Sequence, residues 1–464
     1  MLDYDLEGRG SLSLYEFLYQ SIKRDIECGA LASHEKLPSK RMLAEHLGVS
    51  LITVENAYAQ LVTEGYCYTK PRSGYYVAEI PFAMARKPVK PSWSISEKPV
   101  DSQDCLDLSQ ATADPSVVAR VWGKALRSAL THETDDELYG PQHPQGTLRL
   151  RRAIARRLHE TRGIVADPAC IVVGAGSQLL DAALAQLLRP QGGIALENPG
   201  YPRLAQIYQA AGLAVHPVAL DDEGIAMPAL RASGASLVHI MPSHQFPTGI
   251  VTSIARRHEL LAWAYEVPGR YIVEDDYDAP FRMAGRPVAS LTSIDVHERV
   301  IYTNTFSKSL GPALRMAFMV LPPSLIDAWA QNVGFYANTV SVVDQIALAR
   351  MLETGDYERH VNRYRKAQRD VRDAFVNELF AYVDTQRVHV EQADSGLHFV
   401  LSIANADEDS VADAALARGV RLAPLGSYTM GEYAPSRDAR FAIQYGGLDV
   451  DSARESARII ASCI

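Results

Sequence analysis

Seven short apolar segments, separated from one another by helix-length stretches, constrain the fold of this chain more than any other feature. They cover residues 171–173, 193–196, 214–218, 237–241, 271–273, 300–302 and 317–321. Most of them are apolar on both faces, which is typical of strands in a parallel sheet that helices cover on both sides. From residue 106 onward, the sequence therefore predicts an α/β fold built on a mainly parallel seven-stranded sheet.

A proline-rich stretch separates this region from the N-terminal residues. Residues 79–105 hold four prolines, which favour an extended linker over a packed element. Residues 1–78 carry short helical patterns and end in a segment rich in Tyr and Gly. We therefore expect a small domain at residues 1–78, a linker at 79–105 and a large domain at 106–464.

Charge and composition narrow the possible functions. The net charge is −9, from 46 Lys and Arg against 55 Asp and Glu, so any contact with nucleic acid requires a local basic patch. The five cysteines form no CxxC pair, which argues against a disulfide framework or a zinc site and fits a reducing cytoplasm. The chain has no apolar run long enough to cross a membrane, and its acidic N-terminus does not resemble a signal peptide. We therefore expect a cytoplasmic protein.

The N-terminal zone carries the pattern of a winged helix-turn-helix. Apolar residues at helical spacing predict a helix over residues 12–28, and Ser39 and Ser50 are the expected N-caps of two further helices that meet at Gly48. The alternating segment 66–77 predicts a β-hairpin wing. The second helix of such a pair can enter the DNA major groove. The alternative is a small helical domain that binds another protein.

Three motifs in this zone resemble the GntR-type winged helix: Leu-Pro-Ser-Lys-Arg at 37–41, Leu-Gly-Val-Ser at 47–50 and Arg-Ser-Gly at 72–74. The resemblance implies binding to a double-stranded DNA operator. Leu51 stands where many such domains carry Arg, and Glu55 where a basic residue is common, so the base-reading set does not transfer. The residues that we expect to contact DNA are Lys40, Arg41, Ser50, Thr53, Lys70 and Arg72.

The strongest chemical motif of the large zone is the stretch 304–315, which directly follows a predicted strand. The amine of Lys308 within it can form a Schiff base with an aldehyde cofactor. Thr305, Ser307 and Arg315 can bind a phosphate group. This combination predicts a site for a phosphorylated aldehyde.

An acidic string, Glu-Asp-Asp-Tyr-Asp at 274–278, follows another predicted strand. In an open α/β sheet, ligands gather at the carboxyl ends of the strands. A buried aspartate there can pair with a protonated pyridine nitrogen, and a tyrosine can bind a phenolate oxygen. The alternative is a magnesium or calcium site, but the spacing is not that of an EF-hand loop and no second cluster supports it. We predict no metal.

Further motifs also follow predicted strands. The glycine-rich turn at 174–178 would offer backbone amides to a phosphate at a helix N-terminus. Tyr201 could stack on a flat ring. Two further candidate site motifs are the segment 239–249 and the pair Tyr139-Gly140.

Taken in order, these motifs resemble the fold-type I pyridoxal phosphate enzymes of the aspartate aminotransferase superfamily, over roughly residues 106–464. The resemblance implies pyridoxal 5′-phosphate (PLP) as the cofactor, a Schiff base at Lys308, and a C-terminal α+β subdomain from about residue 325. It implies that Asp275 pairs with the pyridine nitrogen, Tyr277 binds the phenolic oxygen and Tyr201 stacks on the ring. The other cofactor contacts would be Ser177, Gln178, Thr305, Ser307, Arg315, His244 and, from a second subunit, Tyr139.

A winged helix fused to this fold is the architecture of the MocR/GabR-type transcriptional regulators. The strings Pro-Ser-His-Gln-Phe-Pro-Thr-Gly at 242–249 and Glu-Asp-Asp-Tyr-Asp at 274–278 resemble that group more than they resemble free-standing aminotransferases. The resemblance implies a head-to-tail homodimer. It also implies that PLP or an amino compound acts as the effector.

The sequence departs from active aminotransferases at several positions. Ala442 stands where they place the arginine for the substrate carboxylate, and Phe246 stands where they place an asparagine. Arg440 lies two residues earlier, about 6.7 Å along the predicted strand on the same face, where it would clamp a longer ligand or lie ion-paired at the rim. Regulators of this group usually have Glu where this chain has Pro280. These departures predict weak or absent transamination of ordinary α-amino acids.

We therefore expect a PLP-dependent DNA-binding transcriptional regulator that senses an amino compound, or PLP itself, through a Schiff base at Lys308. The alternative is an active PLP-dependent aminotransferase that carries a DNA-binding arm.

Overall fold

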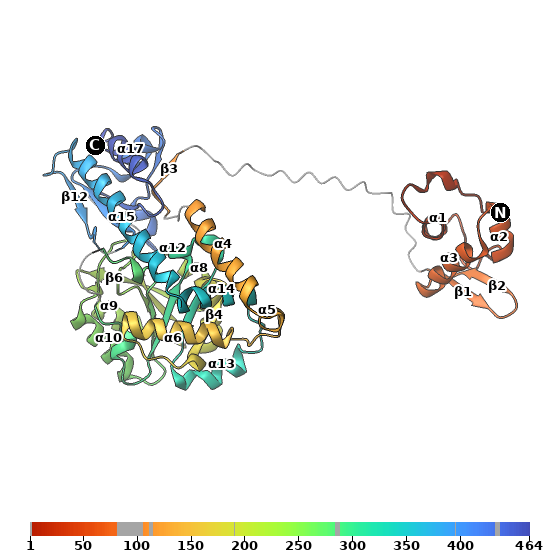
Figure 1. Cartoon of the computed structure of the whole chain (residues 1–464), viewed down its shortest axis with the longest axis horizontal. Helices are drawn as coiled ribbons and strands as arrows, with labels where there is room; N and C mark the ends of the chain where they lie inside the picture. Colours follow the sequence, from red (N-terminus) through yellow and green to blue (C-terminus); the bar gives the residue numbers. More distant parts are fainter. Residues whose placement is uncertain are drawn as a thin grey trace. The chain divides into compact units, whose positions relative to one another are not determined.

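The computed structural model describes residues 2–80, 105–110, 115–189, 191–283, 288–394, 396–431 and 437–464. The chain divides into two units, residues 1–100 and 101–464 (Figure 1). Nearly all of the expected proline-rich linker at 79–105 lies outside the described residues.

The N-terminal unit is a winged helix. It consists of a 3₁₀ turn η1 (Leu6–Arg9), the helices α1 (Leu14–Glu27), α2 (Lys40–Leu47) and α3 (Leu51–Thr63), and the hairpin β1 (Cys67–Lys70) and β2 (Gly74–Val77). Ser39 and Ser50 cap α2 and α3 as predicted, because each hydroxyl accepts a hydrogen bond from the amide three residues on. Gly48 ends α2 with a φ of 66°, a conformation that favours glycine.

All seven apolar segments form strands of one sheet in the large unit. Its strands are β4 (Ile171–Gly174), β5 (Ile194–Asn198), β6 (Val215–Asp221), β7 (Gly224–Ile225), β8 (Leu237–Ile240), β9 (Tyr271–Asp275), β10 (Val300–Thr305) and β11 (Ala317–Val320), in the spatial order β4-β11-β10-β9-β8-β5-β6-β7. Strands β6, β5, β8, β9 and β10 are parallel to one another, whereas β7 runs antiparallel to β6 and β11 runs antiparallel to both of its neighbours. The eighth strand, β7, was not predicted because its two residues carry no strand pattern.

Helices cover both faces of this sheet. They are α4 (Pro115–His132), α5 (Asp135–Tyr139), α6 (Leu148–Arg162), α7 (Ser177–Leu188), α8 (Pro202–Ala210), α9 (Met227–Ala232), α10 (Ile254–Glu266), α11 (Leu291–Ile294), α12 (Ser307–Leu310), α13 (Ile326–Asn332) and α14 (Val342–Glu353). Alternate strand residues join different apolar clusters: Ile301 and Met319 pack in one, Tyr302 and Phe318 in another. Strands buried on both faces explain why the segments read as unbroken apolar runs.

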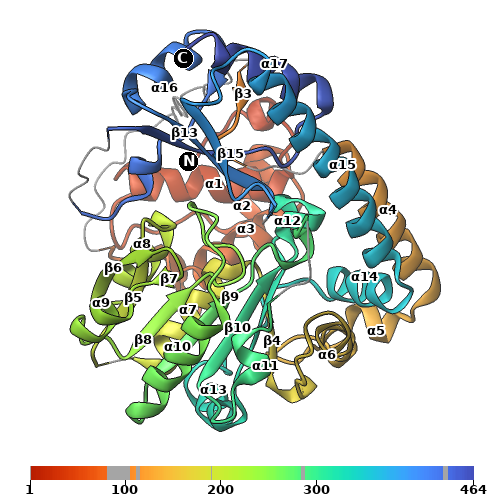
Figure 2. The ribbon, with the colours of Figure 1, turned by 90° about the vertical axis from the view of Figure 1, so that its left-hand side faces the viewer.

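A smaller α+β part follows, as expected. It contains the long helix α15 (Asp356–Phe380), the antiparallel sheet of β12 (Val388–Glu391), β13 (His398–Ile403) and β15 (Ala439–Gln444), and the helices α16 (Glu408–Leu416) and α17 (Val450–Ala461). Within the large unit, α15 runs beside α4 and α14 (Figure 2). Strand β14 (Val420–Arg421) pairs with β3 (Leu106–Asp107), so the first described residues of the large unit belong to this part.

Candidate functional site

Several of the predicted site residues of the large unit lie where strands of the large sheet end. Asp275 is the last residue of β9 and lies opposite Thr303 of β10. Lys308 follows β10 in the short helix α12, and Ser177 is the first residue of α7, directly after β4. The carboxyl ends of these neighbouring strands bring separate motifs to one edge of the sheet.

Lys308 and Tyr277 face each other at this edge. The ammonium nitrogen of Lys308 lies 5.8 Å from the centre of the Tyr277 ring. Burial lowers the pKa of Lys308, although the carboxyl groups of Asp278 and Asp275 oppose the shift. The hydroxyl of Tyr277 is buried and has no hydrogen-bond partner within the described part of the chain. An amine with a lowered pKa is a better nucleophile, and the unpartnered phenol beside it is available to a bound molecule.

Asp275 is held by two buried side chains behind it. Its Oδ2 lies 3.6 Å from Nε2 of His239, and Nδ1 of His239 lies 2.9 Å from the hydroxyl of Tyr208. Burial disfavours protonation of His239, but the carboxylates of Asp275 and Asp181 outweigh it and raise the pKa of this histidine. This chain of contacts fixes one buried carboxylate at the end of β9.

Arg315 forms one wall of a cradle at the start of α7. It adopts a left-handed conformation with a φ of 47°, and its guanidinium lies over Gly176, the N-cap of α7. A Cβ at Gly176 would lie only 2.8 Å from the guanidinium carbon. Thr305 accepts a hydrogen bond of 3.1 Å from the amide of Ser307. A guanidinium beside free amides at a helix N-terminus is suited to a phosphate dianion.

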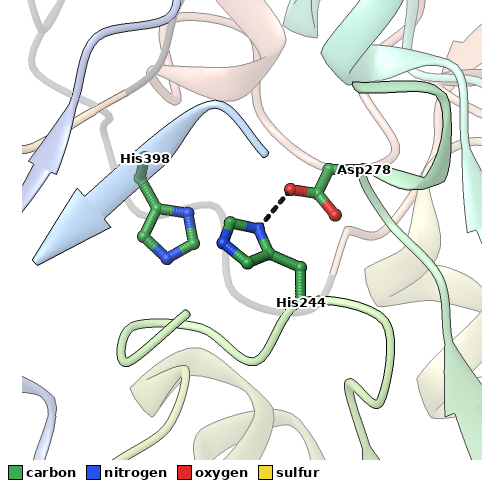
Figure 3. Close-up of side chains that lie close together, drawn as sticks. All are labelled: His244, Asp278 and His398. Carbon is green, nitrogen blue, oxygen red and sulfur yellow. Dashed lines mark hydrogen bonds and ion pairs between the residues drawn. The ribbon is translucent and has the colours of Figure 1, made fainter. Parts of the chain in front are cut away.

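The structure also brings together His244, Asp278 and His398, all of them buried (Figure 3). Nδ1 of His244 lies 2.7 Å from Oδ2 of Asp278, and the two imidazole rings lie 4.1 Å apart. His244 is one of the predicted cofactor contacts, whereas Asp278 and His398 are not among the predicted site residues. Asp278 stood within a motif that was noted, whereas His398 lies in β13, more than a hundred residues along the chain.

His244 and His398 form one wall of the site, and Phe246 continues that wall toward Tyr201. Its ring packs edge-on against His398 at 5.2 Å, Tyr428 at 5.0 Å and Tyr201 at 6.2 Å. An aromatic cluster therefore occupies the place where aminotransferases put an asparagine. The stacking of Tyr201 on a cofactor ring stays a prediction.

Two other acidic residues of the string 274–278, Asp276 and Glu274, make buried contacts that stabilise the fold. Asp276 pairs with the buried Arg162 at 2.9 Å and accepts a hydrogen bond of 2.8 Å from Tyr302. Glu274 accepts hydrogen bonds from the first residues of α11 and pairs with Arg257. The string therefore does not form a single group of carboxylates.

Arg440 has a partner of its own. Its guanidinium lies 2.9 Å from Glu391 of β12, which also binds the hydroxyl of Ser402. Ala442, two residues further on the same face, is fully buried and packs with Val400. The charge of Arg440 is thus already paired, and its role as a ligand clamp stays a prediction.

Tyr139 ends α5 and is 69 % exposed. Its contribution to the site of a second subunit stays a prediction. The positions of Gln178 and Ser177 in the first turn of α7 are compatible with the phosphate contacts expected of them.

The expected DNA contacts lie on α2, on α3 and in the wing. Lys40 at the start of α2 pairs with Glu55 of α3, while Arg41, Lys70 and Arg72 are exposed. The Lys70 ammonium lies 4.6 Å from the ring of Tyr76. Ser50 and Thr53 form the first turn of α3, where their hydroxyls lie 2.8 Å apart.

Both units match known protein families. Residues 103–455 match the family "Aminotransferase class I and II", and residues 14–77 match "Bacterial regulatory proteins, gntR family". Within the described residues, no helix is long and apolar enough to cross a membrane.

Relatives match the chain over nearly its whole length. The HTH-type transcriptional regulator YdeL of Bacillus subtilis is 35 % identical, covering 96 % of each chain. The probable rhizopine catabolism regulatory protein MocR of Rhizobium meliloti is 30 % identical, over 98 % of this chain and 95 % of the relative. The pyridoxine biosynthesis transcriptional regulator PdxR of Corynebacterium glutamicum is 31 % identical, over 94 % and 93 %.

Solved aminotransferase structures share the fold of the large unit. Kynurenine aminotransferase of Pyrococcus horikoshii superimposes with a TM-score of 0.67 at 23 % identity, covering 78 % of this chain and 91 % of that one. Aspartate aminotransferase of Thermus thermophilus gives 0.65 at 19 % identity, over 78 % and 92 %.

Proposed function

Because this chain belongs to the aminotransferase class I and II family and joins it to a gntR-family domain, we propose that its large unit senses a small amine, or PLP itself, through Lys308. The chain is a helix-turn-helix transcriptional regulator with an aminotransferase-like domain, as are its full-length relatives, and the regulator interpretation is favoured over an active aminotransferase. Regulators of the gntR type bind DNA.

The observation that carries this proposal is the convergence of three unlike groups at one edge of the sheet. They are the amine of Lys308 beside the unpartnered hydroxyl of Tyr277, the carboxylate of Asp275, and the cradle between Arg315 and Gly176. The family is PLP-dependent, and these donors fit an aldehyde, a pyridine nitrogen and a phosphate. When bound, PLP would supply an aldehyde that condenses with a primary amine, so that a C=N bond replaces the C=O bond and water is released.

Each residue of the chain then has a distinct task. Lys308 offers an amine whose lowered pKa favours the neutral, reactive form. Asp275, backed by His239, would keep a proton on the pyridine nitrogen, and the hydroxyl of Tyr277 would donate a hydrogen bond to the phenolic oxygen. The phosphate group would be bound by five residues: Arg315, Ser177, Gln178, Thr305 and Ser307.

Sensing requires that the ligand prefer one arrangement of the protein over another. A ligand shifts DNA binding only by its difference in affinity for the two arrangements. We propose a head-to-tail homodimer in which exposed Tyr139 completes the partner's site, working in the cytoplasm where the operator lies. We further propose the domain boundaries 1–78, 79–105 and 106–464, with the smaller part beginning near residue 325.

The test uses full-length protein loaded with PLP. Wild type is expected to show a visible absorption band, Lys308→Ala is expected to lose it, and an exposed control, Lys124→Ala, is expected to keep it. Operator binding is then measured for all three proteins with and without PLP. A Lys308→Ala protein that keeps both the band and the response of its operator affinity would refute the proposal.

A further inference from the structure

Two buried imidazole nitrogens beside Lys308 have no hydrogen-bond partner within the described residues. They are Nε2 of His244 and Nε2 of His398, whose rings lie 4.1 Å apart (Figure 3). A buried polar atom that stays unpaired destabilises the folded state, so such atoms usually pair with protein, water or ligand. Two of them on one wall point to a molecule that pairs with both.

The position of this wall places it on the ligand side of Lys308. The positive charge of Lys308 lowers the pKa of both histidines, and the carboxyl group of Asp278 raises the pKa of Lys308. His398 comes from the small sheet and meets Phe246, which reaches Tyr201. The two histidines therefore share the electrostatic surroundings of Lys308.

Burial favours the neutral form of both histidines. Burial lowers the pKa of His244 to about 3, with a further contribution from the charges of Arg282 and Lys308. Burial also lowers the pKa of His398, although the backbone oxygens of Pro247 and Gln245 oppose the shift. A neutral imidazole carries no charge to a carboxylate, so the two histidines themselves would offset little of the cost of removing a carboxylate from water.

The arginine that could have received a carboxylate is paired elsewhere. Arg440 pairs with Glu391, and the buried Ala442 packs with Val400, Leu425 and Tyr428. Arg282 lines a small cavity together with Arg162, Ser243 and Asp278. On the adjoining face of the small sheet, the buried Ala442 offers no charge to a ligand, and the charge of Arg440 is already paired.

From these observations we propose that the site selects an amino alcohol, a primary amine whose other polar groups are hydroxyls, in preference to an α-amino acid. A hydroxyl both donates and accepts a hydrogen bond, so it pairs with a neutral imidazole nitrogen whichever tautomer the Asp278–His244 contact imposes. An ammonium only donates, and it would also be repelled by Lys308. This inference rests on the proposed function, because it names the amine that Lys308 senses.

Three small amines on the same carbon skeleton test the proposal. They are serinol with two hydroxyls, isopropylamine with none, and L-serine with one hydroxyl and a carboxylate. Each is titrated into PLP-loaded, full-length protein, and its dissociation constant is read from the shift of the visible band. One hydrogen bond to a buried group corresponds to about tenfold in affinity. Serinol is therefore expected to bind about tenfold more tightly than L-serine, which lacks one hydroxyl, and about a hundredfold more tightly than isopropylamine, which lacks both.

Two variants test whether His244 and His398 cause the preference for serinol. His398→Leu removes one nitrogen, and Gly396→Ala places a Cβ within 2.5 Å of His244 Cε1, against its contact with Asp278. Each variant is expected to reduce the advantage of serinol over isopropylamine by about tenfold, the value of one hydrogen bond, while keeping the band. His389→Leu, on the exposed face of β12, is the matched control and is expected to keep the preference.

The outcomes separate this inference from the proposed function. If PLP gives no Lys308-dependent band, the proposed function fails. If the band forms but serinol binds no more tightly than L-serine and isopropylamine, or shifts nothing, the inference is overturned while the proposed function stands. A preference that survives undiminished in both His398→Leu and Gly396→Ala overturns the assignment to these histidines.

Discussion

Replacement of Gly176 by alanine is a sharp test of the phosphate cradle. Gly176 has a φ of 96°, and a Cβ there would lie 2.8 Å from the guanidinium carbon of Arg315, so the arginine must move. This backbone conformation, with a φ of 96° and a ψ of 158°, adds strain of about 1–3 kcal/mol in any residue other than glycine. A displaced guanidinium also loses a charge-assisted hydrogen bond to phosphate, worth about 1.5–3 kcal/mol, or roughly tenfold to a hundredfold in PLP affinity.

Gly163 provides the matched control for this substitution. It has a φ of 67° at the end of α6, with open space around its missing Cβ, so Gly163→Ala introduces strain without displacing a neighbour. The dissociation constant for PLP is measured by titrating the visible band, and the free energy of unfolding by urea denaturation. Both variants are expected to lose stability, but only Gly176→Ala is expected to lose PLP affinity. Equal PLP affinity in the two variants would refute the reasoning about the cradle.

Other predictions follow from the same structure. Arg162→Ala leaves the carboxylate of Asp276 buried and unpaired, which is expected to cost about 3–5 kcal/mol in urea unfolding; a loss below about 1 kcal/mol would contradict a buried pair. Burial raises the pKa of Asp181 from 3.8 to about 7, so the folded protein keeps a proton that the unfolded chain releases. Stability is therefore expected to fall as the pH rises from about 4 to about 7, and Asp181→Asn is expected to weaken that dependence in urea titrations at several pH values. Lys70→Ala and Arg72→Ala are each expected to weaken operator binding and to lower the slope of log affinity against log salt by about one, with wild-type slopes contradicting phosphate contacts in the wing.

The main elements of the fold could be predicted from local patterns. Strands buried on both faces read as unbroken apolar runs, and all seven runs are strands. The hydroxyls of Ser39 and Ser50 cap helices because a side-chain oxygen can bind an unpaired amide of the first turn. The edge strand β7 was missed because two residues, Gly224 and Ile225, show no alternation.

Contacts between distant segments could not be predicted in this way. Strand alternation put Arg440 on the face of Ala442, but the ion pair with Glu391 depends on which residue the neighbouring strands bring beside it. His398 carries no local mark of its meeting with His244, because their contact depends on how the small sheet packs against the large one.

The most direct test of the central claim follows two signals in one sample of PLP-loaded protein. The visible spectrum is recorded as an amine is added, while operator binding is measured by fluorescence anisotropy. A sensor is expected to show a band that shifts and then holds, together with a changed operator affinity that Lys308→Ala does not show. A band that bleaches and returns when a 2-oxo acid is added, with operator affinity unchanged throughout, would identify a working aminotransferase and contradict the account.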